Sequence, residues 1–349
     1  MIDIAERCHI ISAWPDAQSR DEWVQSRTKG LGGSDIGSIL GVNKYKSALE
    51  VWVEKTGAVK AEEIDNEAIR WGNRLERPVA EEFAHRQNLA VVSWPVTLRM
   101  KLHEWAIANL DFLIVEPSDR FPAGQVTDWE TTEVPPGIAA ILEIKTSGIG
   151  SYGKPEEWGD DDNPTYPISY EYQCRHYSNV SGIREVYLVA LVAGRGLTIR
   201  KLPVDAELSN YLFLRAEHFW TDCVLAENPP TPDHTDSAAE VLKTLYPKPV
   251  EEKEYEGGGS LDGLWSDLRQ AKVDFDVAEK HKKELRNKIV ALIGDAEYGT
   301  VYGNRVCSFK GGDSIEWFDE KSFARDNPKL YAQYRRTRPG HRSLREVKG

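Results

Sequence analysis

The chain has 349 residues, of which 40% are hydrophobic and 29% charged, and its formal net charge is −12. It is long enough for one large domain or two, and it has no apolar run of the roughly 20 residues that a membrane-spanning helix needs. The acidic balance does not favour a nucleic-acid-binding protein, although a basic groove can coexist with an acidic exterior.

The first residues lack the basic and then apolar pattern of a signal peptide. The four cysteines are scattered along the chain without a Cys-x-x-Cys pair, which argues against a zinc or iron–sulfur site. Free cysteines also suit a reducing compartment. We therefore expect a cytoplasmic protein, in a bacterium or a phage-infected host cell, with no membrane partner.

Near the N-terminus, residues 16–27 have helical spacing and end in Arg27. The glycine-rich segment 30–35 follows, with Ser34 and Asp35 as the expected N-cap of a short apolar helix over 36–40. Exposed N–H groups and the positive end of a helix dipole favour a bound phosphate. A plain capped helix without a ligand explains the same pattern, so both interpretations stay open.

Residues 61–87 repeat apolar side chains at helical spacing, at Trp71, Leu75, Val79 and Phe83. Glu76 lies one residue off that stripe, where its carboxylate can face a cleft. Pro78 predicts a kink in this helix or a fresh start just after Glu76.

Two strands are expected over 91–100 and 105–115, and a third over 141–146. Asp111 is a carboxylate inside the apolar second strand. Side chains alternate along a strand, so Glu143 and Lys145 point to the same face of the third.

Two interpretations fit the Glu-x-Lys pair. One is a same-face ion pair on an exposed strand. The other is the centre of a metal-dependent nuclease, where Glu143 binds Mg²⁺ and Lys145 orients or deprotonates the attacking water. Charged groups are costly to bury without partners. Asp111 is a candidate second metal ligand, because hard cations take oxygen ligands.

The remaining N-terminal segments complete an alternating α and β pattern. Residues 116–137 read as a surface insertion, and 148–167 as a mobile loop near the cleft. A helix is expected over 169–181, in which Gln173 and Tyr177 share a face. Strands over 186–192 and 197–204 and a helix over 207–225 follow.

Prolines, a charged run and a glycine cluster predict a linker over 229–260, which separates a domain of residues 1–228 from an extension of residues 261–349. The extension starts with five heptads, whose d positions include two alanines and whose a positions include Lys282. Strand-like pieces over 300–309 and 314–318, a helix over 320–334 and a basic tail over 335–348 complete it.

Six short motifs, taken in this order, resemble the YqaJ-type viral recombinases, the lambda-exonuclease branch of the PD-(D/E)xK, or restriction-endonuclease-like, nucleases. They run from about residue 20 to about residue 194. They are Arg27 with Ser34, Tyr45-Lys46-Ser47 leading to Glu54-Lys55-Thr56-Gly57, Gly72-Asn73-Arg74-Leu75-Glu76, Asn109-Leu110-Asp111, Glu143-Ile144-Lys145-Thr146, and Tyr172-Gln173-Cys174-Arg175-His176-Tyr177.

The resemblance implies an α/β (α+β) fold, with a central mixed β-sheet flanked by helices. To this the chain adds a C-terminal extension that is helical and coiled-coil-like, with a small α/β part. By resemblance, Asp111, Glu143 and the carbonyl of Ile144 hold Mg²⁺, for which Mn²⁺ can substitute. Glu76 acts on metal-bound water and Lys145 on the nucleophile.

The resemblance also assigns Gln173 to positioning the active site, and Arg27 and Ser34 to binding a DNA 5′-phosphate. It implies an exonuclease that resects linear double-stranded DNA from 5′ to 3′ and leaves 3′ single strands for phage-type recombination by single-strand annealing. The implied partners are duplex DNA ends, a single-strand annealing protein and further copies in a ring-like homo-oligomer. The insertion at 116–137 and the C-terminal extension depart from short family members.

Two alternatives remain at this point. One is a structure- or sequence-specific endonuclease on the same fold, and the other is a non-catalytic scaffold that binds DNA ends. The sequence contains no P-loop lysine, no cysteine quartet and no Ser-His-Asp pattern, which disfavours a helicase-coupled or iron–sulfur nuclease. Its eight histidines have no ligand spacing, and only His176 lies near the proposed cleft.

Overall fold

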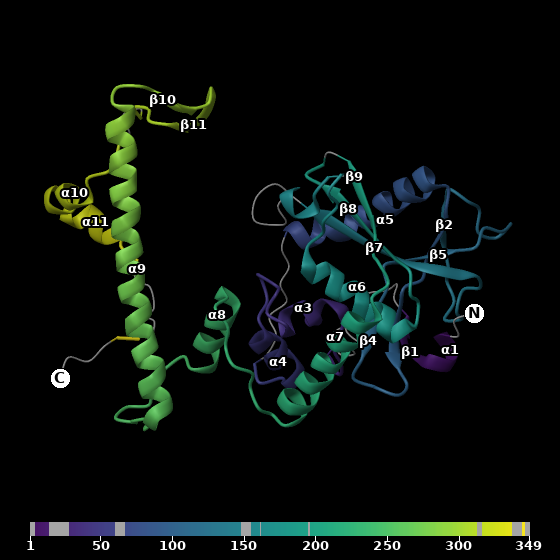
Figure 1. Cartoon of the computed structure of the whole chain (residues 1–349). Helices are drawn as coiled ribbons and strands as arrows, with labels where there is room; N and C mark the ends of the chain where they lie inside the picture. Colours follow the sequence, from purple (N-terminus) through teal and green to yellow (C-terminus); the bar gives the residue numbers. More distant parts are fainter. Residues whose placement is uncertain are drawn as a thin grey trace. The chain divides into compact units, whose positions relative to one another are not determined.

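The computed structural model describes residues 4–13, 28–59, 67–147, 155–160, 162–194, 196–312, 316–336 and 344–345. The chain divides into two compact units, Met1–Pro247 and Lys248–Gly349 (Figure 1). The helix predicted over 16–27, Arg27 included, lies outside the described residues. Among the helices of the described ranges, none is both long and apolar enough to cross a bilayer.

A six-stranded mixed sheet forms the centre of the first unit, with strand order β6-β2-β5-β7-β8-β9. Its strands are β2 (Ala90–Ser93), β5 (Phe112–Val115), β6 (Val126–Asp128), β7 (Ile138–Ser147), β8 (Val186–Val192) and β9 (Leu197–Lys201). The pairs β7–β8 and β2–β6 are parallel and the other pairs antiparallel. The predicted central mixed sheet is confirmed.

Helices cover both faces of this sheet, and alternation along β7 sorts its side chains between them. Leu142 and Ile144 pack on one face with Val79 and Phe83 of α5 (Glu67–Gln87). Ile141 packs in the other core, which includes residues of α3 (Gly33–Ile39) and α6 (Ile168–Ser181). Glu143 and Lys145 share the parity of Ile141, so they point toward α6.

Two predicted strands are each broken into two, because the chain leaves the large sheet and returns to it. The segment 91–100 splits at Trp94 and Pro95 into β2 and β3 (Val96–Met100), and 105–115 splits at Leu110 and Asp111 into β4 (Ile107–Asn109) and β5. β3 and β4 belong to a separate antiparallel sheet with β1 (Cys8–Ala13). Asp111 therefore lies at the bend between two sheets and not within a strand.

The segment 116–137 is not merely a surface insertion. It contains β6, which extends the large sheet by pairing with β2, and Phe121 and Trp129 are buried. Their rings contact each other at a centroid distance of 5.5 Å. The predicted loop 148–167 likewise contains a short helix, η1 (Pro155–Trp158), in its described part, and Trp158 is buried.

Helix α5 runs without interruption through Pro78, although a kink or restart was predicted there. Its predicted apolar stripe is also only partly right. Val79 and Phe83 are buried against the sheet, whereas Trp71 is 49% exposed. The reason is that only the C-terminal half of α5 contributes to the core beneath it.

The remaining helices of the first unit are α1 (Ile4–Arg7), α4 (Ala48–Thr56), α7 (Ala206–His218), η2 (Phe219–Leu225) and α8 (Asp236–Leu245). Helix α4 begins at the N-cap Ser47 and ends at Gly57 in the left-handed conformation. Helix α8 lies inside the predicted linker of 229–260, yet Ser237 donates a hydrogen bond to the Glu50 carboxylate and accepts one from the backbone N–H of Ser47 at 3.0 Å. The compact unit therefore extends to Pro247, beyond the predicted boundary at residue 228.

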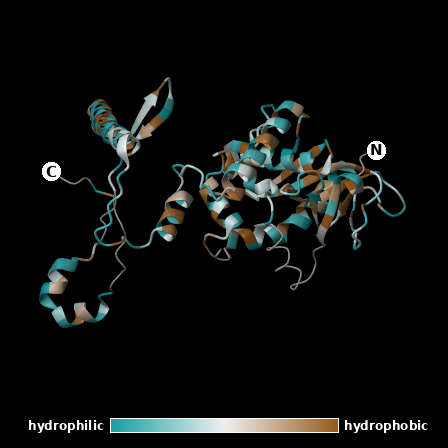
Figure 2. Ribbon diagram, turned by 90° about the horizontal axis from the view of Figure 1, so that it is seen from below, coloured by the Kyte–Doolittle hydropathy of each residue, from teal (hydrophilic) through white to brown (hydrophobic). Residues whose placement is uncertain are grey.

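The second unit contains the predicted long helix, α9 (Gly258–Ile293), and both hydrophobic and hydrophilic residues run along its surface (Figure 2). The piece predicted over 300–309 is a hairpin of β10 (Tyr298–Val301) and β11 (Asn304–Ser308), which turns at Tyr302 and Gly303. Residues 316–318 are not a strand. The helix predicted over 320–334 is two helices, α10 (Glu320–Asp326) and α11 (Pro328–Tyr334).

Candidate active site

Glu143 and Lys145 lie on β7, near the middle of the large sheet. The Glu143 side chain is fully buried, and that of Lys145 is 20% exposed. The Lys145 ammonium donates a hydrogen bond to Oε1 of Glu143. A pair in this position is not a solvated ion pair on an exposed strand, which removes the simpler of the two interpretations.

The bend at Asp111 places its carboxylate beside this pair. Oδ2 of Asp111 accepts a hydrogen bond from the backbone N–H of Ile144 at 2.9 Å. Ile144 lies between Glu143 and Lys145, so the bond ties the start of β5 to the reactive part of β7. The structure thus brings together Asp111, Glu143, Ile144 and Lys145 from segments far apart in the sequence.

Glu76 reaches the same cluster from α5. Burial, and then the nearby charge of Asp111, raise the pKa of Glu76 to about 8, although Lys145 acts in the opposite direction. The helix comes close to the sheet at Gly72, where a Cβ atom would lie 3.7 Å from Oγ1 of Thr146. A carboxyl group with a pKa near neutrality can both accept and release a proton.

Gln173 on α6 covers the cluster from the other side. Its Nε2 donates to Oε1 of Glu143 at 2.7 Å and to the hydroxyl of Tyr177 at 2.9 Å. The ring of Tyr170 lies 5.2 Å from the Lys145 ammonium. Sequence reasoning assigned no site role to either tyrosine, although Tyr170, Gln173 and Tyr177 follow the i, i+3, i+7 spacing of one helix face.

Charge in the cluster is unbalanced. Burial first, and then the charge of Asp111, raise the pKa of Glu143 well above its usual value, while Lys145 acts against this. Burial alone would lower the pKa of Lys145, but the charges of Glu143 and Asp111 outweigh it and raise that pKa. Among the residues that the structure describes, three interacting carboxyl groups face the one ammonium of Lys145, so the cluster has room for further positive charge.

One atom shows where such charge would be accommodated. Oε2 of Glu143 is buried and accepts no hydrogen bond from any residue that the structure describes. When both carboxyl groups are ionised, Asp111 cannot satisfy it, because a carboxylate only accepts hydrogen bonds. The hydrogen bond between Glu143 and Asp111 that helps to raise the pKa of Glu143 needs a proton shared by the two groups. Within the described ranges, no three His, Cys, Asp or Glu side chains converge as a ready-made metal site. Two carboxylates supplemented by a backbone carbonyl and water nevertheless suit a hard cation such as Mg²⁺.

The glycine-rich segment near residue 33 has a different cap from the one predicted. The N-cap is Gly32, and Ser34 and Asp35 lie in the first turn of α3. The buried Asp35 carboxylate accepts the Gly32 N–H at 3.0 Å and pairs with Lys55 at 2.8 Å. The Lys55 side chain is 3% exposed, so this ion pair is internal and fixes the start of the helix.

Ser34 is exposed on a helix that touches the one carrying Gln173. A Cβ atom added at Gly33 would lie 2.6 Å from the ring of Tyr177 and 2.9 Å from Cγ of Gln173, so only glycine fits between these helices. Ser34 is therefore next to the helix that lines the carboxylate cluster. Arg27, its predicted companion, lies outside the described residues.

His176 has a structural position. Its Nε2 lies 3.1 Å from the carbonyl oxygen of Leu31 and 3.0 Å from that of Ile107, which it can bond as a shared donor. Burial lowers its pKa to about 4, so the imidazole is neutral. It joins the segment before α3 to β4. That His176 binds no metal remains a prediction.

Two solved structures similar to this chain are those of the alkaline exonuclease LHK-Exo from Laribacter hongkongensis. One of them, in complex with dAMP, has a TM-score of 0.43 and 15% sequence identity, and the match covers 64% of this chain and 96% of that chain. The other has a TM-score of 0.43 and 14% identity over 60% of this chain and 94% of that chain.

Among curated proteins, one from African swine fever virus is 38% identical over 60 residues, which is 17% of each chain. The protein YqaJ of Bacillus subtilis is 32% identical over 291 residues, which is 83% of each chain. Residues 22–184 match the YqaJ-like viral recombinase domain, and this range contains every residue of the carboxylate cluster. The chain belongs to the family of YqaJ-like viral recombinase domains.

Proposed function

We propose that the protein is a Mg²⁺-dependent deoxyribonuclease that hydrolyses DNA from its ends. The observation that carries this proposal is the buried carboxylate of Glu143, whose Oε2 atom accepts no hydrogen bond from any described residue while Asp111 and Lys145 lie beside it. A buried carboxylate oxygen without a partner is destabilising. A bound cation would satisfy it, and cation-assisted hydrolysis of a phosphodiester is the chemistry that such a cluster serves.

Asp111, Glu143 and the carbonyl oxygen of Ile144 would hold the metal. When bound, Mg²⁺ would supply charge to the phosphate and make a water molecule more nucleophilic. Mn²⁺ prefers the same oxygen ligands and would replace it. The charge of Asp111 raises the pKa of Glu143, which supports a site that the two carboxylates share.

Lys145 contributes a permanent positive charge in this proposal. Its raised pKa keeps the ammonium protonated, so it donates hydrogen bonds and does not accept a proton. Of the two roles considered from sequence, orienting the nucleophile is favoured over deprotonating it. Its charge also stabilises the negative charge that gathers on the phosphate in the transition state.

Glu76 and Gln173 complete the assignment. The Glu76 carboxyl, with its pKa of about 8, is suited to taking the proton of the attacking water. Gln173 uses one amide hydrogen to hold Oε1 of Glu143, so that Oε2 would remain available to the metal. We assign it a positioning role, because it acts through Glu143.

The substrate we propose is linear duplex DNA, cut from 5′ to 3′ so that 3′ single strands remain for recombination. Ser34, together with Arg27, would receive the terminal 5′-phosphate. Support comes from the exposure of Ser34 and from the close contact of its helix with Gln173 and Tyr177. A single-strand annealing protein remains the predicted partner, since such a protein would bind the strand that resection exposes.

A comparison of linear and closed circular duplexes tests this proposal. The same sequence is supplied in both forms, with one end label, in Mg²⁺, in Mn²⁺ and in a chelator. We expect linear DNA to be degraded from its 5′ ends, circles to survive, and the chelator to stop the reaction.

Cleavage of closed circles would instead identify an endonuclease. If the purified chain binds linear ends but releases no nucleotides with either metal, it is a binding scaffold. The variant Lys145→Ala provides the control for contaminating nucleases, because a contaminant's activity would persist in it.

A further inference from the structure

The second unit contains a helix whose apolar side is uncovered. In α9, the a positions are Leu261, Leu268, Phe275, Lys282 and Ile289, and the d positions are Leu264, Ala271, Ala278, Leu285 and Leu292. All ten are exposed, with Leu264 at 69%, Phe275 at 66% and Leu292 at 88%. An amphipathic helix of 36 residues normally covers such a stripe with another element.

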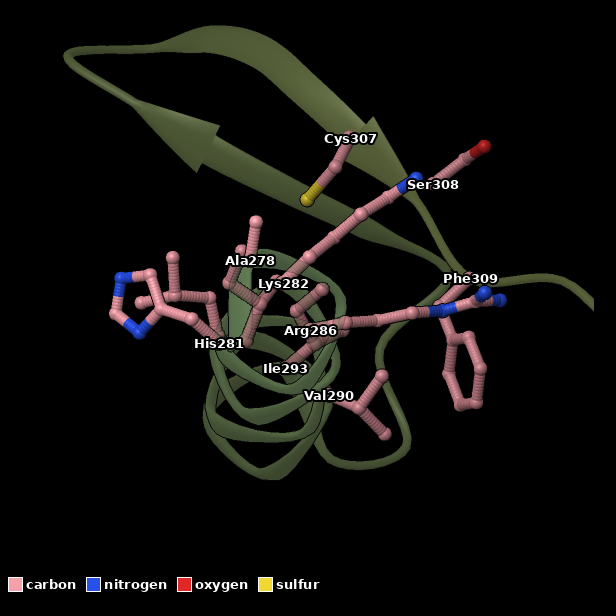
Figure 3. Close-up of a pocket in the computed structure, with 11 residues that line it drawn as sticks. Ala278, His281, Lys282, Arg286, Val290, Ile293, Cys307, Ser308 and Phe309 are labelled. Atoms are coloured by element: carbon pink, nitrogen blue, oxygen red, sulfur yellow. The ribbon is translucent and has the colours of Figure 1, made fainter. Parts of the chain in front are cut away.

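A groove opens over the C-terminal half of the stripe. It has a volume of about 540 Å³ and lies between α9 and the end of the β10–β11 hairpin. Figure 3 shows Ala278 and Lys282 of the helix with Cys307 and Phe309 of the hairpin around it. The groove thus presents stripe residues within a basic rim that includes Arg286.

Charge is distributed unequally along α9. Its first part, residues 258–277, contains four aspartates and only two basic residues. Its second part, residues 278–293, contains five lysines and arginines and only two glutamates. The first part of α9 therefore combines an apolar stripe with negative charges. A segment of this composition suits the apolar groove and basic rim on the second part.

We propose that α9 pairs with α9 of a second copy of this chain as an antiparallel coiled coil. Full overlap in this orientation places every a residue opposite a d residue. The ten layers are of five kinds, each of which occurs twice: Leu261–Leu292, Leu264–Ile289, Leu268–Leu285, Ala271–Lys282 and Phe275–Ala278. The large Phe275 and the long Lys282 each face an alanine, so each has space, and no layer sets two lysines together.

The flanking positions match in the same register. Asp267 of one copy faces Lys288 of the other, and Asp274 faces His281. On the opposite flank, Lys272 faces Glu279. Charges at these positions set partner choice and orientation in coiled coils. Lys288 already pairs with Glu284 on its own helix at 2.6 Å, but that pair is exposed and contributes little.

A parallel pair of the same helices is less favourable. Lys282 would face Lys282 of the second copy within the apolar seam. Asp274 would face Glu279, and His281 would face Arg286. Only Asp267 with Lys272 would attract. The occupant of the groove is therefore the N-terminal half of α9 from a second copy, which inserts Leu264 and Leu268 with Asp267 at the rim.

Disulfide trapping in the full chain tests the orientation. Cys223 and Cys307 are first replaced by serine, and Leu264→Cys and Ile289→Cys are then made separately. In the antiparallel pair, neither variant alone forms a dimer-linking disulfide, whereas an equimolar mixture of the two does. Non-reducing electrophoresis under mild oxidation gives the readout, and reduction of the band provides the control.

Charge exchange supplies a second, independent test. Asp267→Lys should weaken dimerisation of the full chain roughly tenfold, because the exposed pair occurs twice in the symmetric dimer. Adding Lys288→Asp should restore it, whereas adding Lys272→Asp should not. The matched control is Asp276→Lys, the same charge change on the outer side of α9. Sedimentation equilibrium over a concentration series measures each constant.

Each alternative has its own result. Self-linking of either cysteine variant alone would establish a parallel pair and overturn the proposal. So would restoration by Lys272→Asp. Absence of links in the mixture would overturn it too, and would leave the stripe to a different protein. The variants Asp276→Lys and Asp267→Lys could also weaken dimerisation equally. That result would show that net charge alone controls assembly, which also contradicts the proposed register.

Discussion

The two units of this protein differ in what they bury. The first has a core on each side of its sheet and encloses charged groups such as Glu143 and Asp35. In the second, no residue of its described ranges is buried, although it contains a helix of 36 residues. The first unit is complete in its packing, whereas the second presents an apolar side that another chain can cover.

The difference assigns separate tasks to the two units. A surrounding structure is needed to hold carboxylates together against their mutual repulsion, and a completed core supplies it. An uncovered amphipathic helix gains stability only on association. We therefore propose that the chemistry belongs to the first unit and assembly to the second. Four changes to the chain test the candidate site, the packing around it and this division.

Glu143→Gln should produce the largest effect. The amide keeps the shape of the side chain but removes the charge that would hold the metal, so DNA cleavage should fall by roughly 10²–10³ or more. Lys145→Ala should cause a similar loss. Titration calorimetry should show weaker Mg²⁺ binding in Glu143→Gln only.

The control for this change is Glu185→Gln. Glu185 lies just before β8, is 50% exposed and pairs with Lys201 on the surface at 2.9 Å. Its variant should keep wild-type cleavage and metal binding. Full activity in Glu143→Gln would remove the cluster from the mechanism.

His176→Gln should change the response of stability to pH. The pKa of His176 falls from 6.5 to about 4 on folding, so below pH 6.5 the unfolded chain takes up a proton that the native protein does not. The contribution of His176 to the free energy of unfolding is therefore fully present above pH 6.5 and is lost as the pH falls to about 4, a change on the order of 3 kcal/mol. Glutamine can donate to the same carbonyls but does not titrate, so its stability should fall less over this range.

Urea unfolding at several pH values between 4 and 7 measures this difference between variant and wild type. His218→Gln is the control, since the His218 side chain is 72% exposed. Equal pH slopes for His176→Gln and wild type would mean that the imidazole is not held neutral by burial.

Ser34→Ala should have a smaller effect, limited to end recognition. We expect the wild type to cut 5′-phosphate ends faster than 5′-hydroxyl ends. Loss of one hydrogen bond to a charged group should reduce that preference roughly tenfold. Arg27→Ala should abolish it, because a guanidinium matches phosphate oxygens. Lys29→Ala removes a nearby exposed charge and should leave the preference intact. A wild type indifferent to the end group would make residues 32–35 an ordinary helix start.

Removal of residues 248–349 should have the smallest effect on cleavage. All proposed catalytic residues lie in the first unit, so the rate per chain in Mg²⁺ should stay within about twofold. Light scattering should show a smaller assembly at the same concentration. An insoluble or inactive fragment would contradict the division into two tasks.

The sequence by itself determined those features whose signal is local. Alternation placed Glu143 and Lys145 on one side of a strand, and a continuous apolar run predicted β8 with the bounds Val186–Val192 that the structure has. Gly57 and Gly182 end α4 and α6 in the left-handed conformation, a local signal because glycine adopts it without strain. The heptad rows predicted α9, because periodicity along a helix does not depend on distant partners.

Only the tertiary structure decided which segments meet. Strand propensity continues through Leu110 and Asp111, yet the chain changes sheets there, because the strands available for pairing come from distant parts of the sequence. The break at Pro95 is different, since the missing N–H of proline is a local signal for it. The docking of α8, the edge strand β6 and the site positions of Tyr170 and Tyr177 follow from the same non-local packing. Burial likewise decided the raised pKa of Glu76. The electrostatic environment of a side chain is created by residues that are distant in sequence, so the sequence around Glu76 does not reveal it.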